Sequence, residues 1–308
     1  MSASVEALCS FELPGGDEVV ISRRRFVGGP GPRVVIVAAV RGDTPEGTRV
    51  AHVVARYLAE VHERLLGTVD IYPCVNPLAA DHGARNWPAF DVDLNRRFPG
   101  RADGHGPDLV ARALLDAVAG SAQVIELRGA HPAFREETQA HVWGSDPVVL
   151  DRATRTNVRV VWRRSDIGAR TGTLASVVPG LICLEGGVGN RLTDGVGQEL
   201  ADGVLNLLVV LGVLPEADLP FHWAAIQRPL VASDEQVIRV HAERGGLFLP
   251  LTHTWAELDA GDAIGEVVDP VRGDTLDVIL SPVAGRVLAQ REQPVVYPGS
   301  LVARMVRA

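Results

Sequence analysis

The chain has 308 residues, of which 46% are hydrophobic and 22% charged, a composition typical of an ordinary globular protein with one large or two moderate domains. The formal net charge of −8 gives no electrostatic support for binding to nucleic acid. All 30 basic residues are arginine, so chemistry that needs a lysine, such as a Schiff base, is excluded.

The first two thirds of the chain alternate strand-like and helix-like segments. The apolar, β-branched run at residues 33–40 predicts a buried strand, and residues 48–66 carry their apolar side chains on one broad face, which predicts a helix. Further strands are predicted at residues 68–75, 123–127, 158–162 and 181–184, and further helices at residues 107–118 and 194–211. This alternation is typical of an α/β fold in which helices cover both faces of a sheet.

The pattern changes after two prolines, Pro215 and Pro220. From about residue 225 the chain shows short, closely spaced strands without helical periodicity. These strands are predicted at residues 237–242, 246–250, 263–268, 275–280 and 285–289. We therefore expect an α/β domain over residues 1–220 and a small all-β, barrel-like domain over residues 221–308.

Charged residues directly follow three of the predicted strands. Arg41 follows the first strand, Arg128 the third and Glu185 the fifth. Ligands of open α/β sheets bind at the carboxyl ends of the strands, so we expect these three side chains to lie around one crevice. A carboxylate beside two guanidiniums has a lowered pKa, which makes Glu185 either a weak base or an ion-pair partner of the arginines.

A long loop at residues 81–106 is rich in glycine, proline and arginine. Structured loops of this length are often functional. Within the loop, Asn95 and Arg96 are adjacent, and a guanidinium next to an amide is a good clamp for a carboxylate. We expect both residues to bind an anionic substrate, whereas the neighbouring Arg97 is expected to be a solvated side chain.

Three segments together resemble the succinylglutamate desuccinylase/aspartoacylase family of zinc carboxypeptidase-like deacylases. They are Arg41-Gly42-Asp43-Thr44, Asp93-Leu94-Asn95-Arg96 and Val124-Ile125-Glu126-Leu127-Arg128. The resemblance extends through the C-terminal third, and it implies a mixed sheet of the zinc carboxypeptidase type followed by a small barrel. It also implies that Glu185 is the catalytic glutamate, which polarises the attacking water, and that Asn95 and Arg96 hold the substrate carboxylate.

In that family two histidines and a glutamate bind the zinc, and the resemblance places Arg41, Arg128 and Thr44 at their positions. Zinc needs electron-pair donors, whereas a guanidinium is cationic and only donates hydrogen bonds. We therefore expect no zinc and no other cofactor at this site. Arg41 and Arg128 are interpreted as a fixed positive charge in place of the metal, suited to a carboxylate, a phosphate or a developing oxyanion. The alternative interpretation is that the zinc ligands were lost by random mutation after loss of function, and that these arginines are solvated surface groups.

The remaining residues indicate no further site. The cysteines Cys9, Cys74 and Cys183 are far apart and lack CxxC spacing, which indicates neither disulfides nor a thiolate metal site. The histidines lack ligand spacing, and His141 is expected to be structural. Because no signal peptide and no run of ~18 apolar residues is found, we expect a cytoplasmic protein without a membrane partner. The sequence leaves open whether the chain forms a homo-oligomer.

Two functions fit these features. The first is a metal-independent enzyme on the deacylase scaffold, acting on a small carboxylate-bearing amide or amino-acid-derived metabolite. In this hypothesis Arg41 and Arg128 stabilise an oxyanion or enolate and Glu185 moves a proton; without zinc-activated water, proton transfer, cyclisation, elimination or acyl transfer is favoured over hydrolysis. The second is a non-catalytic pseudo-deacylase that binds an anionic metabolite or a partner. An ordinary amide hydrolase is the default that the replaced zinc ligands argue against.

Overall fold

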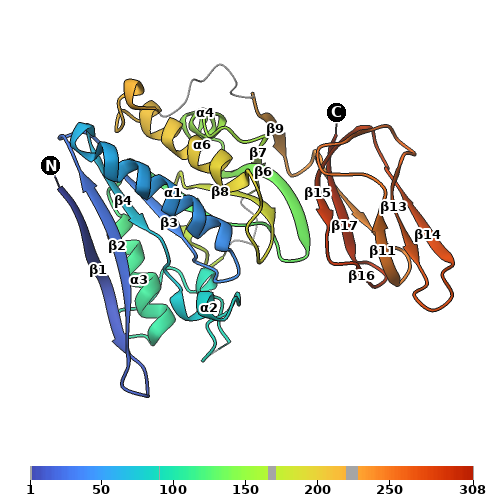
Figure 1. The fold of residues 1–308 in the computed structure, drawn as a ribbon, viewed down its shortest axis with the longest axis horizontal. Coiled ribbons are helices and arrows are strands. Elements are labelled where there is room, and N and C mark those ends of the chain that lie inside the picture. The colour runs from blue at the N-terminus through green and yellow to red at the C-terminus, as the bar shows by residue number, and fades with distance from the viewer. Residues whose placement is uncertain (1, 90, 166–170, 220–227, 308) are drawn as a thin grey trace.

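The computed structural model describes residues 2–89, 91–165, 171–219 and 228–307 (Figure 1). Four parallel strands form the centre of a mixed sheet, in the order β4 (Thr68–Tyr72), β3 (Arg33–Ala38), β5 (Gln123–Leu127) and β8 (Ile182–Val188). Ala38, Leu127 and Leu184 lie side by side in register. The carboxyl ends of β3 and β5 therefore meet at one edge of the sheet. Strand β8 continues past that edge to Val188, paired with β6, so Glu185 lies inside a strand and not directly after one, as the sequence had predicted.

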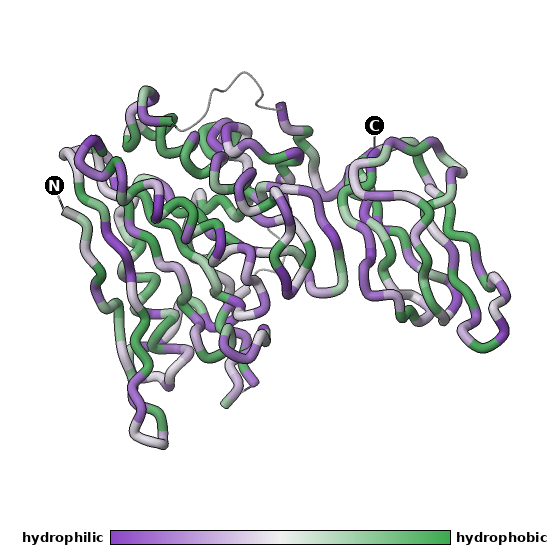
Figure 2. The backbone as a smooth tube through the Cα atoms, in the orientation of Figure 1, coloured by the Kyte–Doolittle hydropathy of each residue, from purple (hydrophilic) through white to green (hydrophobic). Residues whose placement is uncertain are grey.

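Helices cover both faces of these strands. The three long helices are α1 (Pro45–Val61) and α6 (Val196–Val210), which pack against each other on one face, and α3 (Gly106–Val118) on the other. Strand β3 contacts both layers, because Ile36 packs in the same core cluster as α1 and α6 while Val37 packs with α3. A strand covered on both faces is apolar at every position, which explains the continuous apolar run in the sequence. Along α1, hydrophilic and hydrophobic segments alternate, as expected for a helix with one buried face (Figure 2).

Several strands were not indicated by the sequence patterns. An antiparallel hairpin of β1 (Ser2–Glu12) and β2 (Glu18–Val27) extends the sheet beyond β4, and β6 (Phe134–Trp143) pairs antiparallel with β8 on the other side. Strand β7 (Val160–Arg164) then pairs parallel with β6. The short helices are α2 (Pro77–Asp81), α4 (Pro147–Thr154) and α5 (Leu174–Val177), with 3-10 turns at His62–Arg64, Leu94–Arg96 and Glu216–Asp218. None of the helices in the described residues is long and apolar enough to cross a membrane.

The C-terminal part is built from strands alone. They are β9 (Leu230–Ser233), β10 (Val237–His241), β11 (Gly246–Pro250), β12 (Glu257–Leu258), β13 (Ala263–Val268), β14 (Thr275–Leu280), β15 (Gly285–Arg291), β16 (Val295–Val296) and β17 (Leu301–Arg307). Every strand predicted here from the sequence is present. A four-stranded antiparallel sheet, in the order β14-β13-β11-β16, packs through Phe248 and Ile264 against Val287 and Met305 of β15 and β17.

Hydrogen-bonded strands cross the position near residue 220 where the sequence predicted a domain boundary. Strand β15 pairs antiparallel with β6, and β9 pairs parallel with β7 at the edge of the large sheet. Within the described residues this sheet has thirteen strands and continues from the α/β part into the C-terminal part. The predicted fold class, a mixed α/β sheet with helices on both faces followed by a small β domain, is confirmed. The two parts are joined by shared backbone hydrogen bonds and not only by a linker.

Candidate functional site

A cavity of about 290 Å³ lies beside the residues that follow β3 and β5. Among its described lining residues Asp234 is the one acidic side chain, against six arginines: Arg41, Arg85, Arg96, Arg128, Arg164 and Arg239. Asn95 also lines it, so the structure brings four of the five predicted site residues to one cavity, and their roles stay predictions. A larger cavity of about 460 Å³ lies beside Gln123, at the opposite end of β5, and none of the predicted residues lines it.

Arg41 lies three residues beyond the end of β3, in the turn before helix α1. Its Nε atom is fully buried and has no hydrogen-bond partner among the described residues. Burial lowers the pKa of Arg41, and the nearby charge of Arg128 lowers it further, while Glu185 acts in the opposite direction. The two guanidiniums therefore repel each other, and an anion between them would relieve that repulsion.

Arg128 directly follows β5 and is held by its own strand. Its Nε and Nη2 atoms donate to Oε1 and Oε2 of Glu126 at 2.6 and 2.7 Å, and its backbone N–H donates to the carbonyl of Leu184 at 2.8 Å. Burial lowers the pKa of Arg128, but the surrounding anionic groups, Glu126 and Glu185 among them, raise it above its ordinary value. Arg128 is therefore a rigidly held and permanently charged group that keeps further N–H donors for a ligand.

Glu185 follows Leu184 as Arg128 follows Leu127, but its direct partner is a histidine. His141 Nε2, on the neighbouring strand β6, lies 2.9 Å from Glu185 Oε1. The sequence suggested an ion pair with Arg41 or Arg128, and the structure corrects this, since Arg128 is paired with Glu126. Burial raises the pKa of Glu185, but His141 and then the two arginines lower it, so that it lies below its ordinary value. Glu185 is therefore a carboxylate and a weak base at neutral pH.

His141 connects Glu185 to the other side of the cavity. Arg164 Nη1 lies 3.3 Å from His141 Nδ1. Since a guanidinium only donates, Nδ1 accepts this bond, and we place the ring proton on Nε2, toward Glu185. Arg164 Nε lies 3.0 Å from Oδ1 of Asp234, whose Oδ2 accepts the backbone N–H and the hydroxyl of Ser165 at 2.7 Å each. A chain of four polar side chains thus runs from Glu185 to the turn between β9 and β10.

The loop around Asn95 is fixed by hydrogen bonds at both ends of its motif. The side chain of Asp93 accepts the N–H of Asn95 at 2.9 Å, and Asn95 Oδ1 accepts the N–H of Leu174 at 3.0 Å. Arg96 Nη1 donates to the carbonyl of Thr171 at 3.3 Å. Asn95 is nearly fully buried, so its carbonyl oxygen positions the loop while Arg96 faces the cavity.

The residues that the resemblance places at the zinc-ligand positions do not fit a zinc ion. Arg41 and Arg128 offer only cationic donors, and the hydroxyl of Thr44 donates to the carbonyl of Arg41 at 2.8 Å. Within the described parts of the chain, no group of three or more His, Cys, Asp and Glu side chains is placed to hold a metal ion. The mismatch rests on the chemistry of the side chains themselves: two guanidiniums would repel the cation that this position holds in the family.

Comparison with known proteins supports the family predicted from the motifs. Residues 30–127 match the model of the succinylglutamate desuccinylase/aspartoacylase catalytic domain. No curated protein matches the chain. The family model thus covers about a third of the chain, and this segment contains Arg41, Asn95 and Arg96 and ends one residue before Arg128.

Solved structures share the fold over the whole chain. The product-bound ectoine utilization protein EutE (DoeB) from Ruegeria pomeroyi has a TM-score of 0.82 at 20% identity, covering 99% of this chain and 95% of its own. A succinylglutamate desuccinylase/aspartoacylase from Rhodobacter sphaeroides has a TM-score of 0.81 at 23% identity, covering 99% and 94%. An aspartoacylase family protein from Mesorhizobium loti has a TM-score of 0.81 at 19% identity, also covering 99% and 94%.

Proposed function

We propose that this chain recognises a small carboxylate-bearing amide or amino-acid-derived metabolite in the arginine cavity, without a metal ion. One observation carries the proposal. Arg41, at the cavity, has a fully buried Nε atom without a hydrogen-bond partner among the described residues. A buried donor left unpaired costs about 1–3 kcal/mol, which an oxygen atom of a bound ligand would recover.

The charge around the cavity favours an anion. Three lining arginines form ion pairs with acidic residues: Arg85 with Asp93, Arg128 with Glu126 and Arg164 with Asp234. Among the described residues no ion pair is found for Arg41 or for Arg239. Two further carboxylates act on Arg41: Glu185, which is engaged by His141, and the buried Asp43, which has the smaller effect. The cavity therefore keeps an excess of positive charge that a carboxylate or phosphate would neutralise.

The size of the cavity limits the ligand. Its volume of about 290 Å³ lies at the lower end of the roughly 300–1,000 Å³ typical of small-molecule sites. A small metabolite fits this space. The relatives named as succinylglutamate desuccinylases support an amide that carries carboxylates, because that name describes such a substrate.

The reaction that these groups support is the transfer of an activated proton. Arg41 and Arg128 would polarise a carbonyl of the ligand and stabilise the negative charge that develops on its oxygen. Glu185, held by His141, is not among the lining residues of the cavity, so it would accept a proton that this polarisation has made acidic only from a ligand that reaches past Arg41 and Arg128. Because its pKa is held low, Glu185 is poorly suited to activating water. Proton transfer, elimination, cyclisation or acyl transfer is therefore favoured over simple amide hydrolysis.

Binding without turnover is the second candidate, and the histidine favours it. Both ring nitrogens of His141 have partners, Glu185 and Arg164, so the imidazole is not placed to exchange protons with a ligand. In that case the arginines retain the ligand, and Glu185 balances their charge. The two candidates share the ligand and differ only in whether it is changed.

Binding and turnover can be measured on the same protein. Purified chain in the presence of a chelator is screened by thermal shift and calorimetry against dicarboxylates, N-acyl amino acids and phosphates, and each binder is then incubated and analysed by NMR. We expect at least one anion to raise the midpoint of the wild type and of Arg101→Met, an exposed arginine paired with Asp103, but not of Arg41→Met. Stoichiometric zinc binding with zinc-dependent hydrolysis would refute the proposal, and binding without any product selects the second candidate.

A further inference from the structure

The four-stranded sheet of the C-terminal part has two faces of different kinds. Its inner face packs against β15 and β17 through Phe248, Val267 and Ile279. Its outer face is defined by the cross-strand register, in which Leu247 lies opposite Val268 and Val295, and Leu249 and Val278 each lie opposite Glu266. We call this second surface the outer apolar face; its apolar members are Leu247, Leu249, Val268, Leu276, Val278, Leu280 and Val295.

Strand β14 shows how unusual this face is. Its outward residues are Leu276, Val278 and Leu280, which are 38%, 50% and 49% exposed. Its inward residues include Asp277, whose Oδ2 accepts the N–H of Glu243 at 3.3 Å, beside the buried Ile279. An antiparallel sheet with one solvated face normally places polar residues outward and apolar residues inward. In β14 the outward side is the more apolar one, which indicates that something covers it.

The exposed area is large enough for a stable contact. The members with the greatest exposure, besides those of β14, are Leu249 at 41% and Val295 at 48%. For side chains of these sizes the exposed fractions amount to on the order of 400 Å², which is close to the apolar share, somewhat over half, of the roughly 800 Å² that each partner contributes to a standard protein interface. Single monomers rarely expose contiguous apolar patches of this size without a function for them.

We propose that the outer apolar face is the contact surface of a homodimer, in which the same faces of two copies stack about a two-fold axis. The face carries one charged residue, Glu266, and its Oε2 accepts the hydroxyl of Thr275 at 3.0 Å. It has no arginine to attract an acidic protein or an anionic lipid headgroup. A surface that is apolar and nearly without charge is complementary to itself, which is what a two-fold contact requires.

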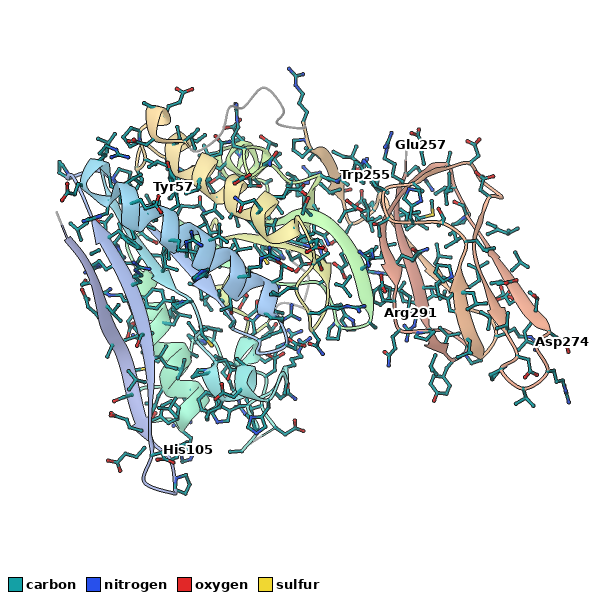
Figure 3. The ribbon with its side chains drawn as sticks, viewed as in Figure 1. Tyr57, His105, Trp255, Glu257, Asp274 and Arg291 are labelled. Atoms are coloured by element: carbon teal, nitrogen blue, oxygen red, sulfur yellow. The ribbon has the colours of Figure 1, made fainter. Side chains whose placement is uncertain are left out.

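The position of the face keeps the dimer compatible with the cavity. Figure 1 shows β14 and β13 on the side of the C-terminal part that lies away from the α/β part. Asp274, between β13 and β14, marks that far side in Figure 3. Two copies joined there would leave the arginine cavities of both open to solvent.

The mass of the full chain in solution tests this contact. Light scattering after size exclusion and sedimentation velocity, from 1 to 100 µM, should give twice the mass of one chain. Val278→Asp and Leu249→Asp each place a carboxylate on the contact, and each should weaken dimerisation at least a hundredfold. Val5→Asp is the matched control, because Val5 is 74% exposed on the outer strand β1 of the other part of the chain, and it should stay dimeric.

The outcomes separate the alternatives. Both aspartate variants should keep the wild-type circular dichroism spectrum and the same thermal shift with a cavity-binding anion, because their side chains are already half exposed. A wild type that remains a monomer at 100 µM overturns the proposal, as does a dimer that both aspartate variants leave intact. A monomer that sediments with neutral phosphatidylcholine vesicles, and no longer does so as Val278→Asp, would identify the face as a lipid contact and also overturn the proposal.

Discussion

Strand β3 has an arginine cluster at each end, and the two clusters differ in their partners. At its beginning, Arg33 shares the fully buried Asp70 with Arg25 and Arg23. Arg25 holds both carboxylate oxygens of Asp70 at 2.7 and 2.9 Å, and Arg33 donates to Asp70 at 3.1 Å and to the carbonyls of Ala117 and Ala119. In this cluster the guanidiniums surround an anion that belongs to the chain itself.

At the other end of β3 the arginines surround a cavity. Arg41 follows the strand with a buried Nε atom that has no partner among the described residues, and Arg128 lies close enough to lower its pKa. Glu126 and Glu185 are each engaged by another side chain, and the remaining carboxylate that acts on Arg41 is the buried Asp43. The same residue type is therefore structural where the fold supplies the anion, and under the proposed function it binds a ligand at the other end of the strand. Partners, and not composition, distinguish the two ends.

The largest expected effect belongs to the structural cluster. Asp70→Asn removes the buried charge that three arginines share, and breaking a buried ion pair by removing one partner is strongly destabilising. We expect the free energy of unfolding, measured with urea, to fall by about 3 kcal/mol or more. Asp103→Asn is the control, because Asp103 pairs with Arg101 at the exposed surface and should leave stability unchanged. A fall no larger than that of the control would mean that the arginines of this cluster are solvated and not held by Asp70.

Removal of Arg41 from the cavity should cost ligand binding but not the stability of the ligand-free protein, which is the opposite of the effect of Asp70→Asn. In Arg41→Met the buried Nε donor without a partner is lost, together with the repulsion from Arg128, so the ligand-free protein should be at least as stable as the wild type in urea. The stabilisation that a bound anion gives, about 2.7 kcal/mol at a hundred times its dissociation constant, should disappear. A ligand-free Arg41→Met protein that is clearly less stable than the wild type would place Arg41 with the structural arginines.

Glu185 should show a smaller effect that depends on pH. Its folded-state pKa lies below the ordinary value of 4.5, so the stability it contributes is present above pH 4.5 and is lost as the pH falls through the folded pKa. Glu185→Gln should therefore lower the free energy of unfolding by about 1–2 kcal/mol at pH 7, and the difference from the wild type should shrink below pH 4.5. Urea unfolding of both proteins at pH 7, 5 and 3.5 measures this difference in the free energy of unfolding. A difference that grows toward low pH would contradict the pairing with His141.

The sequence predicted one side of this site better than the other. Arg41 and Arg128 follow strands that are covered on both faces and therefore read as continuous apolar runs, so their place at one sheet edge could be foreseen. Glu185 follows such a run as well, but it lies inside β8, which continues to Val188 by pairing with β6. Strand β6 could not be predicted from the sequence, because its buried residues include Glu136, Gln139 and His141, which interrupt any apolar pattern.

The contacts that connect Glu185 through His141 to Arg164 and Asp234 were not predicted either, because they depend on strand β6. Arg164 and Asp234 are 70 residues apart in the chain and meet only because β9 pairs with β7. Pattern reasoning identifies residues at strand ends, whereas partners that several separate strands bring together need the fold itself. The domain boundary near residue 220 was placed by a change of pattern, and strand pairing across that position has no signature in local composition.

The smallest expected effect belongs to Arg239, the exposed arginine that β10 contributes to the cavity. An exposed charge interacts weakly with a ligand through solvent, so Arg239→Gln should weaken anion binding no more than about fivefold and leave the urea midpoint unchanged. The difference should also vanish in high salt, because at 1 M the Debye length falls to about 3 Å, whereas the loss caused by Arg41→Met should persist. Calorimetric titration with the anion at 20 mM and 1 M sodium chloride distinguishes the loss of affinity in Arg239→Gln from that in Arg41→Met. If the Arg239 effect is large and survives salt, the ligand reaches the C-terminal part directly, and the cavity has a second point of close contact supplied by the β domain.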